Sequence, residues 1–163
     1  MIAGSSIPDA GPMTPPRVLL ADDHPAIRAL TAEALASECS VVGSVHDGRE
    51  LLAEAERLHP DVIVLDITMP RLDGIEVARQ LRRSHRCASL VFLTVHEDAD
   101  YARAALDAGG LGYVVKARLA SDLLPAIRAT LAGCRFISPT VHLEEARPTS
   151  SDLPDKPTPA STK

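Results

Sequence analysis

The segment DVIVLDITMP, residues 61–70, contains a continuous apolar run between two carboxylates. The run is rich in β-branched residues, which is typical of a strand buried on both faces, because a half-exposed strand alternates with polar residues. Such strands belong to parallel sheets. Asp66 then stands at the carboxyl end of the strand, where open parallel sheets bind their ligands. The alternative is that Asp66 only begins a turn, since Asp is a common turn residue and Pro70 follows closely.

On both sides of this segment, short apolar runs alternate with stretches of helical period. The expected strands span residues 17–21, 41–45, 61–66, 89–94 and 112–115. The expected helices cover approximately residues 25–37, 48–58, 75–83, 98–108 and 121–132, with Pro125 in or just after the first turn of the last helix unless that helix starts later. Alternating strands and helices predict an α/β fold, a parallel sheet covered on both sides through right-handed crossovers.

Polar side chains stand at the carboxyl ends of four of the five expected strands. They are Asp22 and Asp23, Asp66, Thr94, and Lys116. The carboxyl ends of parallel strands share one edge, so these groups should converge. Clustered carboxylates repel one another unless a cation joins them, and Mg²⁺ prefers oxygen ligands, so Mg²⁺ is the expected cofactor. With an ammonium and a hydroxyl to hold an anion, the cluster suits a phosphoryl group that one carboxylate accepts.

The composition is that of an ordinary globular protein. The chain has 163 residues, of which 45% are hydrophobic and 24% charged, and its formal net charge is −5. The negative charge argues mildly against nucleic-acid binding through a basic face. Three cysteines without metal-ligand spacing suit free thiols in a reducing compartment. With neither a signal peptide nor a membrane span in the pattern, we expect a cytoplasmic location and no membrane partner.

Three segments differ in composition. Residues 1–16 are rich in Pro, Gly and Ser and are expected to form a disordered lead. Residues 17–141 carry all the expected strands and helices and form one domain. Residues 142–163 are rich in Pro, Ser and Thr and are expected to form a disordered tail.

Four motifs resemble the receiver domain of two-component response regulators, a CheY-like domain. They are VLLADDH (18–24), DVIVLDITMPRLDGIEV (61–77), VFLTVHEDADY (91–101) and AGGLGYVVK (108–116). The resemblance implies the flavodoxin-like, doubly wound fold, with five parallel strands in the order 2-1-3-4-5 and five helices. The segment AGCRFISPTV (132–141) is similar to the linker of receivers that precede a LuxR-type helix-turn-helix.

The resemblance also implies a role for each site residue, and every position holds a competent side chain. Asp66 would be the phosphoacceptor, assisted by Lys116 and Thr94. The Mg²⁺ ligands would be Asp22, Asp23, Asp66 and the backbone carbonyl of Thr68. Thr94 and Tyr113 would form the conformational switch, and Thr68 and His96 would tune the lifetime of the phosphoryl group. Substitution of Thr94 or Lys116 is expected to leave folding largely intact and to act mainly on the phosphorylated state.

The sequence departs from the family pattern in a few places. Gly110 stands where the family usually has Ala, and Ala117 and Arg118 replace a more usual acidic residue or proline. From His142 onward the basic, Leu-rich helix-turn-helix is missing, so no direct DNA binding is expected from this chain.

The expected partners follow from the same resemblance. They are a sensor histidine kinase and an unknown output protein, with a homodimer through the helix 4/strand 5/helix 5 face or the helix 1/helix 5 face. A stand-alone signalling domain is the main hypothesis. The receiver half of a truncated LuxR-type regulator and a phosphorelay intermediate remain alternatives. An aspartyl-phosphate phosphatase would need an acid at position 68, which is Thr, so enzymatic turnover is not expected.

Overall fold

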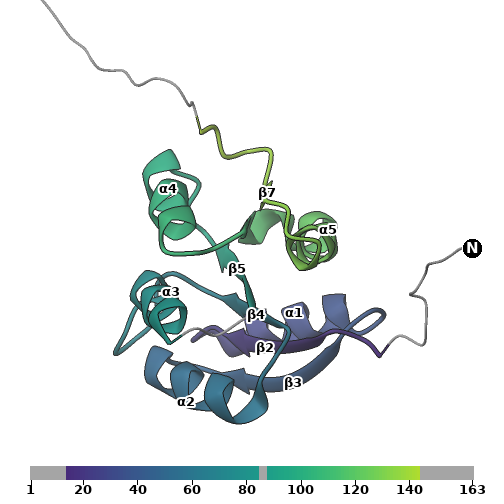
Figure 1. Ribbon diagram of the computed structural model, residues 1–163. Coiled ribbons are helices and arrows are strands. Elements are labelled where there is room, and N and C mark those ends of the chain that lie inside the picture. Colours follow the sequence, from purple (N-terminus) through teal and green to yellow (C-terminus); the bar gives the residue numbers. More distant parts are fainter. Residues whose placement is uncertain (1–13, 85–87, 144–163) are drawn as a thin grey trace, which may run out of the picture.

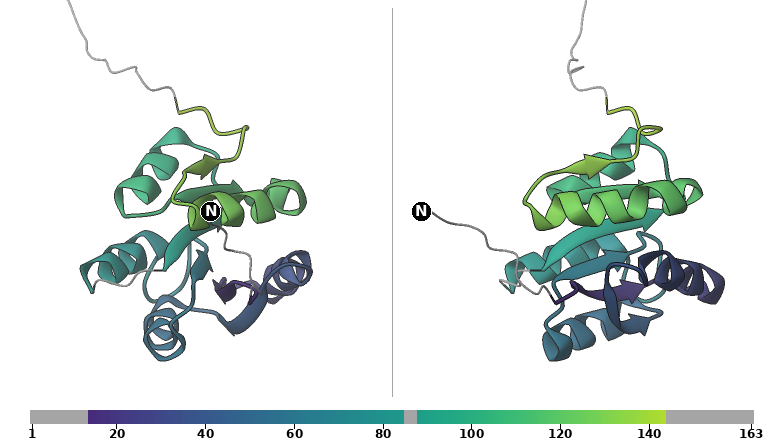
Figure 2. Two further views of the ribbon diagram at one scale, coloured as in Figure 1. Left: turned by 45° about the vertical axis from the view of Figure 1, so that its right-hand side comes forward. Right: turned by 90° about the vertical axis from the view of Figure 1, so that its right-hand side faces the viewer.

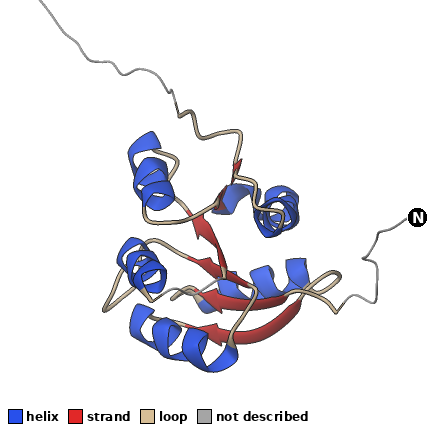
Figure 3. Cartoon of the chain, viewed as in Figure 1, coloured by secondary structure: helices blue, strands red, loops and turns tan. Residues whose placement is uncertain are grey.

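The computed structural model describes residues 14–84 and 88–143. Most of the lead and tail expected from the sequence, residues 1–13 and 144–163, lies outside the described residues, so those expectations stay predictions. Within the described residues, strands lie between two layers of helices (Figures 1 and 3).

The centre of the fold is a six-stranded parallel sheet of order β3-β2-β4-β5-β6-β7. The strands that the sequence predicts are β2 (Arg17–Ala21), β3 (Ser40–Val45), β4 (Val62–Leu65), β5 (Ser89–Thr94) and β6 (Gly112–Val115). Their spatial order is the expected 2-1-3-4-5. The sixth strand is additional.

Helices cover both faces of the sheet. On one face lie α1 (Pro25–Leu35) and α5 (Leu119–Leu131), and on the other lie α2 (Gly48–Leu58), α3 (Gly74–Arg83) and α4 (Ala99–Asp107) (Figure 1). The apolar run of β4 packs against both layers of helices. Val62 and Val64 pack with α1 and α5, while Ile63 and Leu65 pack with the other three helices. This double burial explains why the run contains no polar residue.

The last helix begins earlier than the sequence suggests. A 3₁₀ turn, η1 (Lys116–Arg118), leads directly into α5 at Leu119, so Pro125 lies inside the helix and not in its first turn. The side chain of Arg118 explains the early start, because its guanidinium binds the Asp122 carboxylate one turn later with bonds of 2.7 and 3.1 Å. An ion pair at this spacing stabilises the first turn.

A sixth strand, β7 (Phe136–Ile137), extends the sheet. It runs parallel to β6 and lies beside α5 at one edge of the molecule (Figure 2). Two residues are too few to show the period of a strand, and pairing at a sheet edge depends on tertiary contacts. The sequence pattern therefore predicts only five strands.

Ser138 anchors the end of β7 through buried hydrogen bonds. Its backbone N–H donates to the Tyr113 carbonyl at 2.9 Å, and its Oγ accepts a bond from the Val115 N–H at 3.1 Å. The same hydroxyl donates to Asp122 Oδ2 at 2.7 Å. Burial alone would raise the pKa of Asp122, but its bonds to Arg118 and Ser138 outweigh burial and hold that pKa below its ordinary value.

Replacing Asp122 by Ala is expected to lower the free energy of unfolding by about 2 kcal/mol at neutral pH, because it leaves the buried Ser138 hydroxyl without its acceptor. The folded-state pKa of Asp122 is depressed, so its contribution is present above the ordinary aspartate pKa and is lost as pH falls through the folded value. Urea unfolding of wild type and of Asp122→Ala should therefore show a difference in the free energy of unfolding that becomes smaller in acid. Glu38→Ala is the control, because Glu38 pairs with Arg128 on the surface, where ion pairs contribute little. Equal losses in the two variants would contradict the prediction.

Gly110, a departure from the family pattern, is explained by its neighbour Phe92. A Cβ at position 110 would lie 2.6 Å from Phe92 Cε2 and 3.1 Å from the Ala105 carbonyl oxygen. Phe92 is fully buried in the layer that packs against α2, α3 and α4. The large ring therefore occupies the space that a methyl group at position 110 would need.

None of the helices in residues 14–84 and 88–143 combines the length and the apolar character needed to cross a lipid bilayer.

Candidate functional site

The polar residues singled out by the sequence lie at one edge of the sheet. Asp22 and Asp23 follow β2, Asp66 follows β4, Thr94 ends β5, and Lys116 follows β6. The parallel pairing of these strands brings their carboxyl ends together. Asp66 is 3% exposed and Thr94 is fully buried, so the centre of this edge is shielded by protein.

Backbone contacts fix the position of Asp66. Its N–H donates to the Ala21 carbonyl at 3.0 Å, which extends the pairing of β4 with β2 by one residue. On the other side, the N-terminus of α3 approaches closely, and the Gly74 N–H donates to the Ile67 carbonyl at 2.7 Å. A Cβ at Gly74 would overlap the carbonyl oxygen of Asp66. Gly74, which the sequence pattern marks only as part of the break before α3, is therefore required for the close packing of this loop.

Lys116 lies between two buried carboxylates. Its Nζ donates to Asp66 Oδ2 at 3.1 Å and lies 2.7 Å from Asp22 Oδ2. The three side chains are 4 to 9% exposed, so these ion pairs are shielded from water. The convergence expected from the strand ends is thus found for these three residues.

The electrostatic balance of the site is negative, because three carboxylates face one ammonium. Burial raises the pKa of the Asp66 carboxyl above its ordinary value, the charge of Asp22 adds to the rise, and Lys116 opposes it. Burial alone would lower the pKa of Lys116, but the two carboxylates outweigh burial and raise it. Nearby positive charge therefore favours the ionised form of Asp66.

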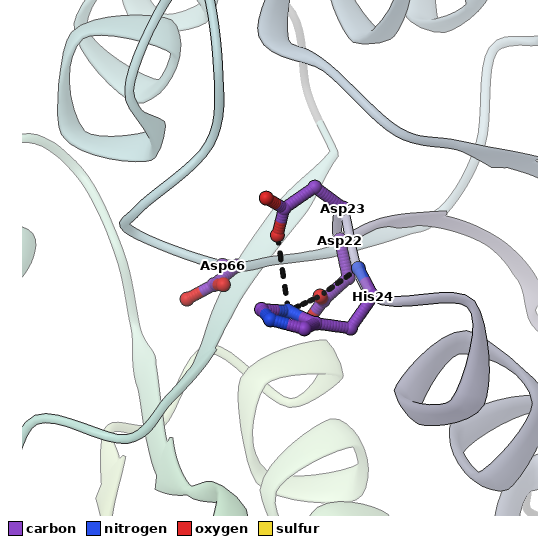
Figure 4. Close-up of side chains that lie close together, drawn as sticks. All are labelled: Asp22, Asp23, His24 and Asp66. Carbon is purple, nitrogen blue, oxygen red and sulfur yellow. Dashed lines mark hydrogen bonds and ion pairs between the residues drawn. The ribbon is translucent and has the colours of Figure 1, made fainter.

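The acidic residues fit a small divalent cation. Ligand atoms of Asp22, Asp23, His24 and Asp66 all lie within 4.8 Å of one another (Figure 4). Asp22 Oδ2 is buried, and the described residues give it the Lys116 ammonium, 2.7 Å away, as its close polar contact. Carboxylate oxygens are the ligands that Mg²⁺ prefers. A cation held by these oxygens would offset the excess negative charge of the site.

His24 contacts both carboxylates of the acidic pair that follows β2. Its ring Nδ1 is 3.1 Å from Asp22 Oδ1 and 3.0 Å from Asp23 Oδ1, and its backbone N–H donates to Asp22 Oδ1 at 2.9 Å (Figure 4). Most of the ring is exposed. His24 therefore holds the two carboxylates in place from the solvent side.

A second set of contacts connects the loops that follow β4 and β5. His96 Nε2 and Thr68 Oγ1 form a hydrogen bond of 3.1 Å, in which the donor depends on the imidazole tautomer. The His96 N–H donates to Thr94 Oγ1 at 3.3 Å, and the hydroxyl of the fully buried Tyr113 donates to the His96 carbonyl at 3.0 Å. Four residues that the sequence singles out as switch or tuning positions thus form one connected network.

Two residues of the site are missed by the sequence analysis. Arg28 on α1 donates to the Asp22 carbonyl at 2.7 Å and fixes the turn after β2. Tyr101 on α4 stacks on the His96 ring, with 3.9 Å between ring centroids and an interplanar angle of 17°. Both lie on helices, where neither spacing nor residue type distinguishes a contact to the site from an ordinary surface position.

The sequence of this chain is similar to a known protein family and to several of its curated members. The response regulator receiver domain family matches residues 18–128. Response regulator GacA of Pseudomonas viridiflava is 39% identical over 127 residues, which cover 77% of this chain and 59% of GacA. Transcriptional regulatory protein PdtaR of Mycobacterium tuberculosis H37Rv is 40% identical over 131 residues, which cover 80% of this chain and 63% of PdtaR. The chain thus spans about 60% of the length of these relatives.

Solved structures of similar proteins superpose well. A LuxR-family two-component response regulator from Aurantimonas sp. SI85-9A1 gives a TM-score of 0.75 at 33% identity, covering 78% of this chain and 93% of that one. The isolated receiver domain of RcsB from Salmonella enterica serovar Typhimurium, solved with the phosphomimetic BeF₃⁻, gives 0.73 at 28% identity, covering 78% and 96%.

Proposed function

Because this chain belongs to the family of response regulator receiver domains of two-component signalling, we propose that Asp66 accepts a phosphoryl group from the phosphohistidine of a sensor histidine kinase. The observation that carries the proposal is the pairing of Asp66 with Lys116 at the carboxyl edge of the sheet, next to Asp22 and Asp23. This arrangement combines a nucleophilic carboxylate with groups that hold a cation and an anion.

The chemistry is a transfer between two protein side chains. A carboxylate oxygen of Asp66 forms a bond to phosphorus as the bond between phosphorus and the imidazole nitrogen of the donor breaks. Lys116 is already within 3.1 Å of Asp66 Oδ2 and is placed to pair with the oxygens of the arriving group. Asp22, Asp23, Asp66 and the Thr68 carbonyl would hold Mg²⁺, which when bound supplies positive charge for the phosphoryl oxygens.

Thr94 and Tyr113 are proposed to report the phosphorylated state. The new group adds about −1.5 to −2 charges, and the Thr94 hydroxyl would donate to one of its oxygens. Tyr113 is linked to the same loop, because its hydroxyl bonds to the His96 carbonyl. Phosphorylation would therefore shift the population of arrangements of the β5–α4 loop and of the face made by α4, β6 and α5. Thr68 and His96, on the two loops beside Asp66, would tune the access of water and hence the phosphoryl lifetime.

The output of the domain is proposed to be protein contact, through an unknown partner or a second copy of the chain. The α4–β6–α5 and α1–α5 faces are the two candidate surfaces for a homodimer.

The matches to LuxR-family regulators favour a second candidate function, in which this chain acts as the receiver part of a transcriptional regulator. A cytoplasmic location fits either role.

A labelling experiment tests the proposal. Incubation with acetyl phosphate and Mg²⁺ is expected to add one phosphoryl group, and peptide mapping after borohydride reduction is expected to locate it at Asp66. Removing divalent cations with EDTA should abolish the label, because the excess negative charge of the site then opposes an incoming anion. Full labelling in EDTA, or a label confined to another acid, would refute the assignment.

A further inference from the structure

The hydrogen bond between Thr68 and His96 connects the loops that follow Asp66 and Thr94. Thr68 and His96 each stand two residues beyond a buried site residue, Asp66 and Thr94 respectively. Thr68 is exposed and His96 is half-buried, whereas Asp66 is 3% exposed and Thr94 fully buried. The Thr68–His96 bond therefore joins the two loops between which water or a small phosphoryl donor would approach.

The backbone of His96 is held from two sides, but these contacts leave its ring free to rotate. The N–H of His96 is bonded to Thr94 Oγ1, and its carbonyl accepts the Tyr113 hydroxyl. A half-buried imidazole attached to a fixed backbone still has rotamers that point into solvent. Another contact is needed to keep Nε2 on Thr68.

Tyr101 supplies that contact from α4. Its ring lies parallel to the His96 ring, with a centroid distance of 3.9 Å and an interplanar angle of 17°. Stacking over the flat face of the imidazole restricts the ring orientation and leaves Nε2 within 3.1 Å of Thr68 Oγ1. Tyr101 is 38% exposed, so its apolar ring is not simply part of the core.

We propose that Tyr101 is a positioning residue for the acceptor site. By stacking on His96 it keeps the Thr68–His96 hydrogen bond closed over Asp66 and slows hydrolysis of the phosphoryl group carried there. The inference rests on the proposed function of Asp66. Tyr101 lies on α4, so a helix of the α4–β6–α5 face would also influence how long Asp66 stays phosphorylated.

The rate of phosphoryl loss tests this role. Wild type and variants are labelled with acetyl phosphate in Mg²⁺, freed of donor, and followed by intact mass. Tyr101→Leu is expected to lose the phosphoryl group about 2- to 10-fold faster, because the energy of one aromatic pair corresponds to a rate factor of this size. Tyr101→Phe keeps the ring and is expected to decay like wild type. Arg103→Ala, an exposed change on the same helix, is the matched control and should also decay like wild type.

A second variant separates positioning from general damage to α4. Thr68→Val removes the partner of His96, so adding Tyr101→Leu to it should cause little further acceleration. In the unphosphorylated protein, the proton NMR signals of the His96 ring should lose their ring-current shift in Tyr101→Leu and keep it in Tyr101→Phe.

The outcomes are distinguishable. A labelled Tyr101→Leu that decays at the wild-type rate would overturn the inference and leave the proposed function intact. Equal acceleration in Tyr101→Phe, or full additivity with Thr68→Val, would also overturn it. Failure of wild type to be labelled would refute the proposed function and this inference with it.

Discussion

Replacing Asp66 by Asn is expected to abolish phosphorylation of the chain by acetyl phosphate and by a cognate kinase. The amide is a poor nucleophile, so no acyl phosphate forms, whereas its size matches that of the carboxyl group. The single amide oxygen can accept a bond either from the Thr68 N–H, which is 3.4 Å from Asp66 Oδ1, or from the Lys116 ammonium, so one of the two bonds is kept. The fold should therefore survive. Intact-mass measurement after incubation with donor and Mg²⁺ is expected to show no phosphorylated species.

The matched control is Asp100→Asn, which removes a carboxylate that is 97% exposed at the start of α4. This variant should be labelled as fully as wild type. Undiminished labelling of Asp66→Asn, without transfer of the group to another acid, would show that Asp66 is not the acceptor. A circular dichroism spectrum unlike that of wild type would instead assign the loss to misfolding, and Asp66→Glu, which keeps the charge, would then decide between the two explanations.

Replacing Lys116 by Met is expected to lower the free energy of unfolding of the metal-free protein by about 3 kcal/mol. The substitution keeps much of the side-chain volume but leaves Asp22 and Asp66 buried without their ammonium. The loss stays at the lower end of the range for breaking a buried ion pair, because these carboxyls can take up protons. Urea unfolding in EDTA, followed by circular dichroism, measures the change. Mg²⁺ is expected to stabilise the variant more than wild type.

Arg128→Met is the control for this experiment, since Arg128 pairs with Glu38 on the surface and its loss should matter less. Equal unfolding midpoints for Lys116→Met and wild type in EDTA would show that the two ion pairs contribute nothing to stability. If Mg²⁺ stabilised Lys116→Met and wild type equally, the result would contradict the view that Lys116 and a bound cation neutralise the same carboxylates.

The structure predicts a larger effect of Lys116 substitution on stability than the sequence does. From the resemblance alone, substitution of Lys116 is expected to leave folding largely intact and to act on the phosphorylated state. The structure shows an ammonium 9% exposed between two buried carboxylates, so a role in stability is expected as well. The sequence pattern predicts that these three groups lie at one edge of the sheet, but it does not predict that one buried ammonium pairs with both carboxylates.

Several features of the fold were determined by the sequence itself. Continuous apolar runs such as 62–65 require burial on both faces, and their alternation with amphipathic segments requires a parallel sheet covered by helices. Once the strands are parallel, their carboxyl ends share an edge. The convergence of Asp22, Asp66 and Lys116 therefore follows from local pattern and chain handedness, and the structure confirms it.

Other features were decided only by the tertiary structure. The pairing of β7 with β6, the early start of α5, and the stacking of Tyr101 on His96 depend on contacts between segments that no local period relates. A two-residue strand carries no period, and a tyrosine on a helix surface has the same sequence pattern whether or not a ring lies against it. Periodicity records which side of an element is buried, whereas packing between elements selects the partner that each side chain meets.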